Sequence, residues 1–127
     1  MRKVINSNQA PKPIGPYSQA VENNDMVFLS GQLGIDPKTG KLVEGGITEQ
    51  TKQAFENIKV ILREGGYTFD SVIKVTCLLD DLDDFQTMND VYKTFFANNF
   101  PARTAYEVSR LPLDAKIEIE VIAARRC

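Results

Sequence analysis

The sequence predicts an α+β domain in which two helices pack on one face of a mixed β-sheet. Two segments carry apolar residues at the spacing of a helix, and others are short runs of β-branched and apolar residues typical of strands. No internal repeat, low-complexity segment or long linker divides the chain, so residues 1–127 are expected to form a single domain. A chain of 127 residues with 43% hydrophobic residues can bury a core without disulfide bonds or metal ions.

The N-terminal part is expected to form a β-hairpin after an irregular start. Residues 1–13 are predicted to be irregular because Pro11 and Pro13 interrupt regular structure. The segment 14–21 is predicted to be a turn that leads into a strand, and Met26–Ser30 is predicted to be a second strand. The Asn and Asp residues between the two strands are typical of a hairpin turn.

The middle of the chain is predicted to contain a long helix followed by a central strand. Residues 36–40 are a turn signal, and a helical period then runs over residues 48–64. The glycine pair 65–66 is expected to end this helix, and the β-branched run 72–79 is predicted to be a strand in the middle of the sheet. The helix residues predicted to face the core are Thr51, Ala54, Phe55, Ile58, Ile61 and Leu62.

The C-terminal part is predicted to hold a second helix and two further strands. The last of the acidic residues in 80–84 suit the positive end of this helix. Residues 98–101 are expected to terminate the helix, and strands are predicted around 104–108 and over 117–124. The apolar residues at helical spacing in this segment are Phe85, Met88, Val91, Tyr92, Phe95 and Phe96.

The sheet face that the helices leave open is expected to contact another copy of the chain. Strand alternation places charged and aliphatic side chains together on this face. The residues concerned are Glu118, Glu120 and Ile122 in the last strand and Val72, Lys74, Thr76 and Leu78 in the central strand. A mixed face of this kind suits a wet oligomer interface better than open solvent.

The composition excludes several classes of chemistry. The chain has no histidine, which excludes Ser-His-Asp catalysis, Cys-His catalysis and HExxH zinc sites. General acid–base catalysis would therefore require a carboxylate, Tyr, Lys, Cys or water. The two cysteines cannot hold a zinc ion alone; Cys77 is expected to be a core residue and Cys127 to be incidental. No metal ion and no organic cofactor is expected.

Charge and hydropathy argue against nucleic-acid and membrane partners. The chain has 15 Lys+Arg and 17 Asp+Glu, a net charge of −2, and no basic stripe that would favour a phosphate backbone. The longest apolar runs, Met26–Leu29 and Val121–Ala124, are far too short to span a membrane. Polar residues at 6–9 follow the basic start, where a signal peptide needs an apolar stretch, so a cytoplasmic location is expected.

Three features of the sequence could carry chemistry. Arg103 begins a predicted strand, and arginine suits a two-pronged grip on a carboxylate, although it could equally be a surface residue. Glu118 and Glu120 share one face of a strand expected to be central. Half-buried carboxylates in such a strand need a hydrogen-bonding or charged partner or a functional role, and salt bridges would also satisfy them. The third feature is a set of turn-adjacent residues with a phenol, a hydroxyl and backbone N–H groups, namely Tyr17, Ser30 and Gly31.

Several motifs together resemble the RidA family, also called YjgF, of reactive-intermediate (enamine/imine) deaminases. The likeness covers nearly the whole chain in order and spacing, and it is most specific between Pro101 and Glu120. In sequence letters the motifs are IGPYSQA (14–20), FLSGQ (28–32), DPKTG (36–40), FPAR (100–103), EVSRLP (107–112) and IEIE (117–120).

The resemblance implies a chorismate-mutase-like α+β fold and a homotrimer with clefts between subunits. It also implies cofactor-free hydrolysis of 2-iminobutanoate and 2-iminopropanoate, which are tautomers of enamines, to 2-oxoacids and ammonia. Arg103 would bind the substrate carboxylate, and Glu118 would position or activate the attacking water. The other substrate-binding residues that the resemblance implies are Tyr17, Ser30, the backbone N–H of Gly31, Asn89 and the backbone carbonyl of Ala105.

The sequence departs from many relatives at Ala105, where a cysteine is common. A thiol at this position therefore cannot be needed here, and only the main-chain atoms of the residue are available. Thr104 and Tyr106 stand where Ser and Val are common. We expect these two residues to affect pocket size and substrate preference more than the reaction itself.

Two other functions remain alternatives at this point. The same pocket could bind 2-oxoacids or other small carboxylates without turnover, so only a turnover measurement separates a binding module from an enzyme. Some relatives are described as ribonucleases or translation inhibitors. The net charge of −2 and the absence of histidine weigh against RNA as a substrate.

Overall fold

A computed structural model describes residues 2–97 and 99–125 of the chain. The two α-helices are α1 (Ile47–Glu64) and α2 (Phe85–Tyr92), and the short 3₁₀ turns are η1 (Phe69–Ser71), η2 (Leu82–Asp84) and η3 (Pro112–Asp114). The strands are β1 (Lys3–Ile5), β2 (Ala20–Asn23), β3 (Met26–Leu29), β4 (Gln32–Leu33), β5 (Ile35–Asp36), β6 (Lys41–Leu42), β7 (Val72–Leu79), β8 (Ala102–Glu107) and β9 (Ile117–Ala124).

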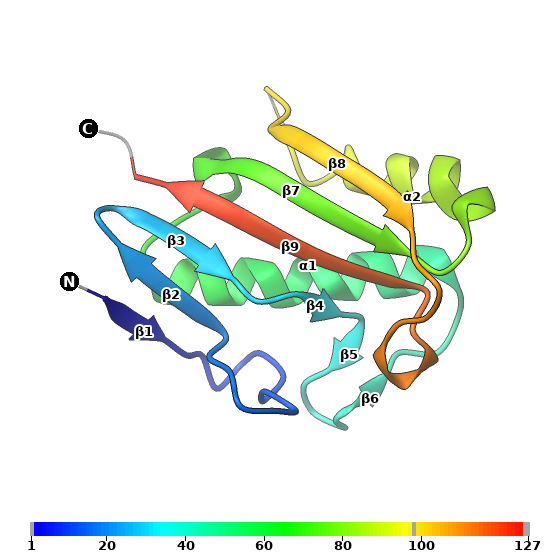
Figure 1. Ribbon diagram of the computed structural model, residues 1–127, viewed down its shortest axis with the longest axis horizontal. Coiled ribbons are helices and arrows are strands. Elements are labelled where there is room, and N and C mark those ends of the chain that lie inside the picture. The colour runs from blue at the N-terminus through cyan, green and yellow to red at the C-terminus, as the bar shows by residue number, and fades with distance from the viewer. Residues whose placement is uncertain (1, 98, 126–127) are drawn as a thin grey trace.

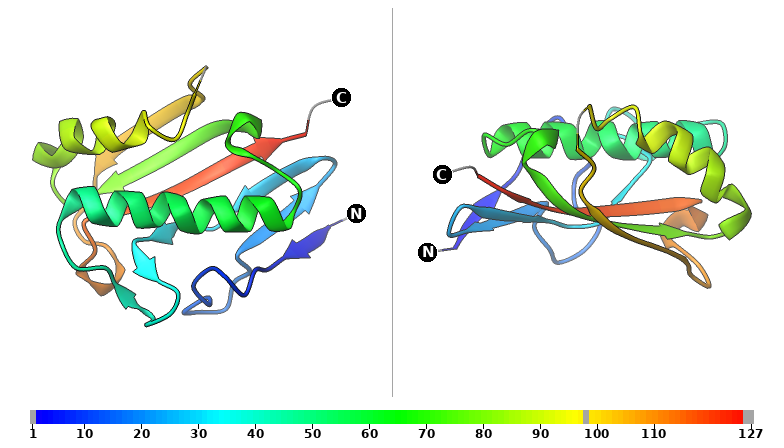
Figure 2. Two further views of the ribbon diagram at one scale, coloured as in Figure 1. Left: turned by 180° about the vertical axis from the view of Figure 1, so that it is seen from behind. Right: turned by 90° about the horizontal axis from the view of Figure 1, so that it is seen from above.

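The molecule has two layers, a mixed β-sheet and a pair of helices on one of its faces (Figure 1). The strand order in the sheet is β1-β2-β3-β9-β7-β8, and β4 also pairs with β9. β7 and β8 run parallel, whereas β9 is antiparallel to β3, β4 and β7. Figure 2 shows α1 and α2 on the same side of the sheet, so the predicted α+β arrangement is confirmed and the opposite face is left uncovered.

The core lies between the helices and one face of the central strands. Every residue predicted to face the core from α1 is buried. β7 and β9 contribute alternate residues, as the period of a strand requires. The buried strand residues are Val72, Val75, Cys77 and Leu79 from β7 and Ile117, Ile119, Val121 and Ala123 from β9. Cys77 is therefore a core residue, as predicted, and burial raises the pKa of its thiol to about 11.

The hairpin and the long helix follow the prediction from the sequence. β2 and β3 pair in antiparallel fashion, and Asn24 and Asp25 join them with φ values of 52° and 63°. Asn and Asp adopt this left-handed conformation more readily than most residues, which explains the turn. α1 ends at the predicted glycine pair, where Gly66 has a φ of 80° that a residue with a side chain rarely adopts.

The prediction that residues 1–13 are irregular is wrong for Lys3–Ile5. These residues form β1, which pairs with β2 and places Val4 opposite Val21. Three residues are too few to display a strand period, and the prolines that suggested irregularity come after the strand. β1 is therefore fixed by its pairing with the hairpin and by the burial of Ile5, which are both long-range contacts.

The second helix is shorter than the apolar stripe predicted. α2 ends at Tyr92, and the backbone N–H groups of Thr94 and Phe95 then donate to carbonyls three residues earlier. The hydroxyl of Thr94 also donates to the Val91 carbonyl at 2.6 Å, which competes with continuation of the helix. Phe96 nevertheless remains buried in the core, so the stripe identified the correct side chains but not the correct end of the helix.

The predicted face of one residue and the predicted bounds of one strand need correction. Val72 lies in the core and not beside Lys74, because a register shift in the pairing of β7 with β9 falls between these two residues. One extra residue in one strand reverses the side to which the preceding side chain points. The strand predicted around 104–108 runs from Ala102 to Glu107. The prediction for Cys127 concerns a residue outside the described part of the chain.

The uncovered face of the sheet carries the expected mixture of charged and aliphatic side chains. The residues concerned are Lys74, Thr76 and Leu78 of β7, Thr104 and Tyr106 of β8, and Glu118, Glu120 and Ile122 of β9. The Lys74 ammonium donates to the Thr104 hydroxyl at 3.0 Å. Phe28 and Tyr106 on this face are 46% and 50% exposed, which is unusual for large aromatic side chains on a central sheet.

Asn57 links α1 to the short strands that follow the hairpin. Its side chain is buried, and its amide nitrogen donates to the carbonyls of Leu33 at 3.2 Å and Ile35 at 2.9 Å. Its amide oxygen accepts a hydrogen bond from Gln53 at 2.9 Å. These bonds satisfy backbone groups at β4 and β5, where the chain leaves the regular ladder of the sheet.

We expect Asn57→Leu to lower the free energy of unfolding by about 2–4 kcal/mol, because two buried carbonyls lose their donor and each unsatisfied group costs about 1–3 kcal/mol. Denaturant unfolding at a fixed chain concentration measures this change. Gln86→Leu is the matched control, since this amide is exposed and its one hydrogen bond in the described part of the chain joins it to Asp90 within α2. A similar loss in both variants would contradict the role assigned to Asn57.

Candidate functional site

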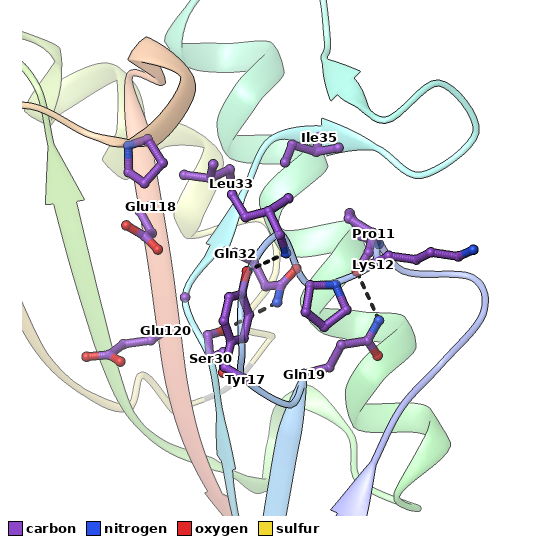
Figure 3. A pocket seen from close by; sticks show the side chains of 14 residues that line it. Pro11, Lys12, Tyr17, Gln19, Ser30, Gln32, Leu33, Ile35, Glu118 and Glu120 are labelled. Carbon is purple, nitrogen blue, oxygen red and sulfur yellow. Dashed lines mark hydrogen bonds between the residues drawn. The ribbon is translucent and has the colours of Figure 1, made fainter.

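A cavity of about 530 Å³ opens between the N-terminal segment, β4 and β9 (Figure 3). We call it the glutamate pocket. It contains four of the predicted site residues, Tyr17, Ser30, Gly31 and Glu118, together with Glu120. The remaining lining residues are Pro11, Lys12, Pro13, Ile14, Gln19, Gln32, Leu33, Ile35 and Pro112.

The wall of the glutamate pocket around Tyr17 and Ser30 is held by hydrogen bonds to backbone groups. The Ser30 hydroxyl donates to the Ser18 carbonyl at 2.6 Å, and the Tyr17 hydroxyl accepts from the backbone N–H of Ile14 at 3.2 Å. The buried amide of Gln19 donates to the carbonyls of Ser7 and Pro11. The N-terminal segment is thereby fixed against the end of β3, although it contains little regular structure of its own.

Gly31 gives the Glu118 side chain the space it occupies. A Cβ atom on Gly31 would lie 2.8 Å from Cδ of Glu118 and still closer to one carboxylate oxygen. A side chain at residue 31 would therefore displace the carboxylate. The group that approaches Gly31 within the chain is the Glu118 carboxylate.

The Glu118 carboxylate is half-buried and has no salt bridge or hydrogen bond to any residue in 2–97 or 99–125. Burial raises the pKa of Glu118 above its usual value, and the nearby charge of Glu120 on the same face of β9 raises it further. The sheet therefore presents a carboxylate whose charged form is disfavoured and whose oxygen atoms are available to a water or a ligand.

Arg103 lies in a different environment, on the helix side of β8. Its Nη1 donates to the side-chain oxygen of Asn89 at 2.7 Å. Its Cζ lies 4.7 Å from the ring centre of Tyr92 and 5.3 Å from that of Phe85. The guanidinium borders a second cavity of about 370 Å³, which we call the arginine pocket; its lining residues are Asn89, Tyr92, Lys93, Phe100, Pro101 and Arg103.

The two pockets lie on opposite faces of the sheet. Arg103 and Ala105 are paired with Val75 and Cys77, which are buried under the helices. Glu118 is on the uncovered face, because its neighbours Ile117 and Ile119 in β9 point into the core. Within one chain, Arg103 and Glu118 therefore do not line a common cavity.

The predicted site residues are thus divided into two groups. Tyr17, Ser30, Gly31 and Glu118 meet in the glutamate pocket. Asn89 and Arg103 meet in the arginine pocket, and Ala105 follows two residues along the same side of β8. Thr104 and Tyr106, which were expected to affect pocket size, lie on the uncovered face.

Two aromatic residues near Arg103 were not predicted as parts of a site. Phe85 and Tyr92 were assigned to the core because they belong to the apolar stripe of the second helix. The structure places both rings beside the guanidinium as well. Their spacing from Asn89, four residues before and three after, puts all three on one side of α2, which is the signal that could have grouped them.

Comparison with known proteins identifies the family. A family model described as endoribonuclease L-PSP matches residues 7–125. The chain belongs to this family, also known as RidA/YjgF. The RidA/YjgF resemblance read from the sequence motifs is thereby confirmed.

Relatives of this RidA/YjgF protein span nearly its full length. It is 55% identical over 123 residues to a RutC family protein of Pyrococcus horikoshii, which covers 97% of this chain and 98% of the relative. It is 50% identical over 123 residues to the human 2-iminobutanoate/2-iminopropanoate deaminase, with coverages of 97% and 90%. The crystal structure of Escherichia coli TdcF with bound serine superposes with a TM-score of 0.93 at 42% identity, covering 98% of this chain and 99% of that one.

Two further properties of residues 2–97 and 99–125 bear on other functional classes. Neither α-helix in this part of the chain combines the length and the apolar composition needed to cross a bilayer. No three His, Cys, Asp or Glu side chains in the same residues come close enough together to hold a metal ion.

We expect Glu118→Gln to stabilise the protein at pH 7 and to have little effect at pH 4. The folded-state pKa of Glu118 is raised, so the wild-type carboxyl is neutral in both states at low pH and contributes nothing there. As the pH rises through this pKa, the folded state carries a disfavoured charge that glutamine lacks. Urea unfolding at both pH values measures the difference, with Glu56→Gln on the exposed side of α1 as control. An equal effect of Glu118→Gln at both pH values would contradict the assigned burial of the charge.

Proposed function

We propose that this protein hydrolyses 2-iminobutanoate and 2-iminopropanoate to 2-oxoacids and ammonia, in clefts formed between copies of the chain in a homotrimer. The observation that carries the proposal is the presence of an arginine with unused donors in one pocket and an unpartnered, half-buried glutamate in the other. The 50% identity to the human deaminase of the same two imines supports the choice of substrates.

The proposed reaction requires a second copy of the chain. Arg103 and Glu118 face opposite sides of the sheet, so one chain cannot present both to a single small molecule. In the proposed trimer, the arginine pocket of one copy adjoins the glutamate pocket of its neighbour. The exposed aromatic rings of Phe28 and Tyr106 on the uncovered face support contact with another copy there.

Binding and orientation would come from both sides of the cleft, with the carboxylate held mainly on the arginine side. Arg103 would hold the substrate carboxylate through two parallel hydrogen bonds, and Asn89 keeps the guanidinium in place by accepting from Nη1. The backbone N–H of Gly31 would assist at the carboxylate, while the carbonyl of Ala105 would face the imine nitrogen. Tyr17 and Ser30 would line the remaining wall.

The chemical step would use Glu118 as a base. Glu118 accepts a proton from a bound water while the water oxygen forms a bond to the C=N carbon, and protonated Glu118 passes this proton to the imine nitrogen. In the resulting tetrahedral intermediate, Glu118 takes the proton of the new hydroxyl group and returns it to the nitrogen as the C–N bond breaks, which releases ammonia and leaves the C=O group of the 2-oxoacid. The raised pKa of Glu118 suits this role, because a base is most effective when its pKa approaches the working pH.

The second candidate function is a non-catalytic module that binds small carboxylates. The TdcF neighbour, crystallised with bound serine, favours a site for a small molecule that bears a carboxylate. Both candidates use Arg103 in the same way, so binding experiments do not separate them. An RNA substrate fits less well, since the chain has no histidine and a net charge of −2.

We expect Arg103→Ala to lower kcat/KM roughly 10- to 100-fold, because a hydrogen bond to a charged group contributes about 1.5–3 kcal/mol. We expect Glu118→Gln to lower kcat roughly 10²- to 10⁴-fold, the usual contribution of a positioned base, down to the spontaneous rate of hydrolysis. The measurement is clearance of 2-aminoacrylate supplied by a dehydratase. Arg110→Ala is the control, because this arginine is exposed and, among residues 2–97 and 99–125, pairs only with Asp114. Unchanged clearance by Arg103→Ala would refute the proposed mechanism.

A mixture of two inactive variants tests the shared cleft. After Arg103→Ala and Glu118→Gln chains are unfolded and refolded together in equal amounts, about a quarter of the clefts should combine an intact arginine with an intact glutamate. Activity should therefore return to about that fraction of the wild-type value. Each variant refolded alone is the control. If the mixture stays as inactive as its components, both residues act within one chain or not at all.

A further inference from the structure

We propose that Tyr92 is a positioning residue for Arg103: its ring, and not its hydroxyl, fixes the guanidinium in the orientation that receives a substrate carboxylate. This inference rests on the proposed role of Arg103 in holding a carboxylate. It assigns a function to a residue that the sequence indicates only as part of the core.

The contacts of the guanidinium leave most of its hydrogen-bonding capacity unused. An arginine side chain has five N–H donors, and within the described residues only Nη1 has a hydrogen-bond partner, the Asn89 oxygen. Arg103 forms no salt bridge with any of these residues. The remaining donors can therefore bind an anion without first breaking an ion pair.

A guanidinium with a single hydrogen bond needs another source of orientation, and the aromatic rings supply it. The Cζ atom of Arg103 lies 4.7 Å from the ring centre of Tyr92, well within the range of a cation–π contact. Phe85 provides a second, more distant ring at 5.3 Å. A ring attracts the cation without occupying its donors, and it adds no negative charge that would repel a carboxylate. A glutamate in the same place would occupy the donors and would also repel the substrate carboxylate.

Tyr92 is a rigid support because its ring is part of the aromatic core. Only 5% of its surface is exposed. Its ring packs edge-on against Phe55 at a centre-to-centre distance of 5.6 Å and in a tilted arrangement against Phe96 at 4.9 Å. On the outer side, Phe100 lies 6.4 Å away. The core thus sets the position of the ring, and the ring sets the position of the guanidinium.

The hydroxyl of Tyr92 does not explain the contact. Its oxygen is buried and has no hydrogen-bond partner among the described residues. Burial raises the pKa of Tyr92 to about 12, so the phenol is neutral at physiological pH and offers Arg103 no negative charge. Removal of the hydroxyl should therefore leave the function of the ring intact.

The test compares ring deletion with ring retention at the same residue. Tyr92→Met removes the ring at similar volume, and Tyr92→Leu is a second ring deletion. We expect both to raise the KM for the imine and the Kd for 2-oxobutanoate about 3- to 30-fold, the range of a cation–π contact, with a smaller change in kcat. Tyr92→Phe should keep wild-type KM and Kd values and should not lower the stability, because it removes only an unsatisfied hydroxyl.

Phe69→Leu is the control for a merely structural role. Phe69 packs against Phe55, Phe95 and Phe96 in the same aromatic cluster, but its ring is not paired with that of Tyr92 and makes no cation–π contact with Arg103. Phe69→Leu should lower the unfolding midpoint while leaving KM and Kd unchanged. In an Arg103→Ala background, Tyr92→Met should weaken 2-oxobutanoate binding no further, because the residue through which it acts is gone.

The outcomes separate this inference from the proposed reaction. If the wild-type protein binds 2-oxobutanoate but turns over no imine, the proposed reaction fails, and the Kd values still decide the role of Tyr92. The inference is overturned if Phe69→Leu weakens binding as much as Tyr92→Met, if Tyr92→Phe weakens it as well, or if the wild type binds no 2-oxoacid.

Discussion

The alternation of side chains along β9 is the constraint on which the rest of the structure depends. β9 pairs with β3, β4 and β7, and its inward side chains Ile117, Ile119 and Val121 are almost fully buried. Burial of each contributes about 1.5–3 kcal/mol. A register slip of one residue would expose these side chains and bury Glu118 and Glu120 under the helices, at a large energetic cost. The same pattern that fixes the core therefore also fixes a pair of carboxylates on the uncovered face.

The elements with strong local signals were predictable from the sequence. The hairpin turn at Asn24 and Asp25, the helix that ends before the glycine pair 65–66 and the alternation of β9 all agree with the structure, because in each case local chemistry and tertiary contacts favour the same conformation. β1 was missed because it depends on pairing with β2, and the inward face of Val72 was missed because it depends on a register shift. Both features depend on contacts between distant segments, so a short stretch of sequence does not predict them.

The candidate site was only partly predictable, and for a different reason. Arg103 and Glu118 could be chosen from residue type and from the family motifs. Their placement on opposite faces follows from the parallel pairing of β8 with β7 and the antiparallel pairing of β9 with β7, which no sequence motif states. Tyr92 was assigned to the core, correctly but incompletely, because an apolar pattern reports that a side chain is buried and not what lies against its ring.

The absence of a side chain at residue 31 makes the choice of residue at position 31 depend on the residue at position 118. Gly31 leaves open the volume that the Glu118 side chain fills, so the two residues share one small space. A methyl group at residue 31 would push the flexible end of the Glu118 side chain out of this space, and a shorter acid such as aspartate at residue 118 would relieve the overlap. A designer who wished to reshape this corner of the pocket would have to treat the two positions as a single unit, one on each of two neighbouring segments.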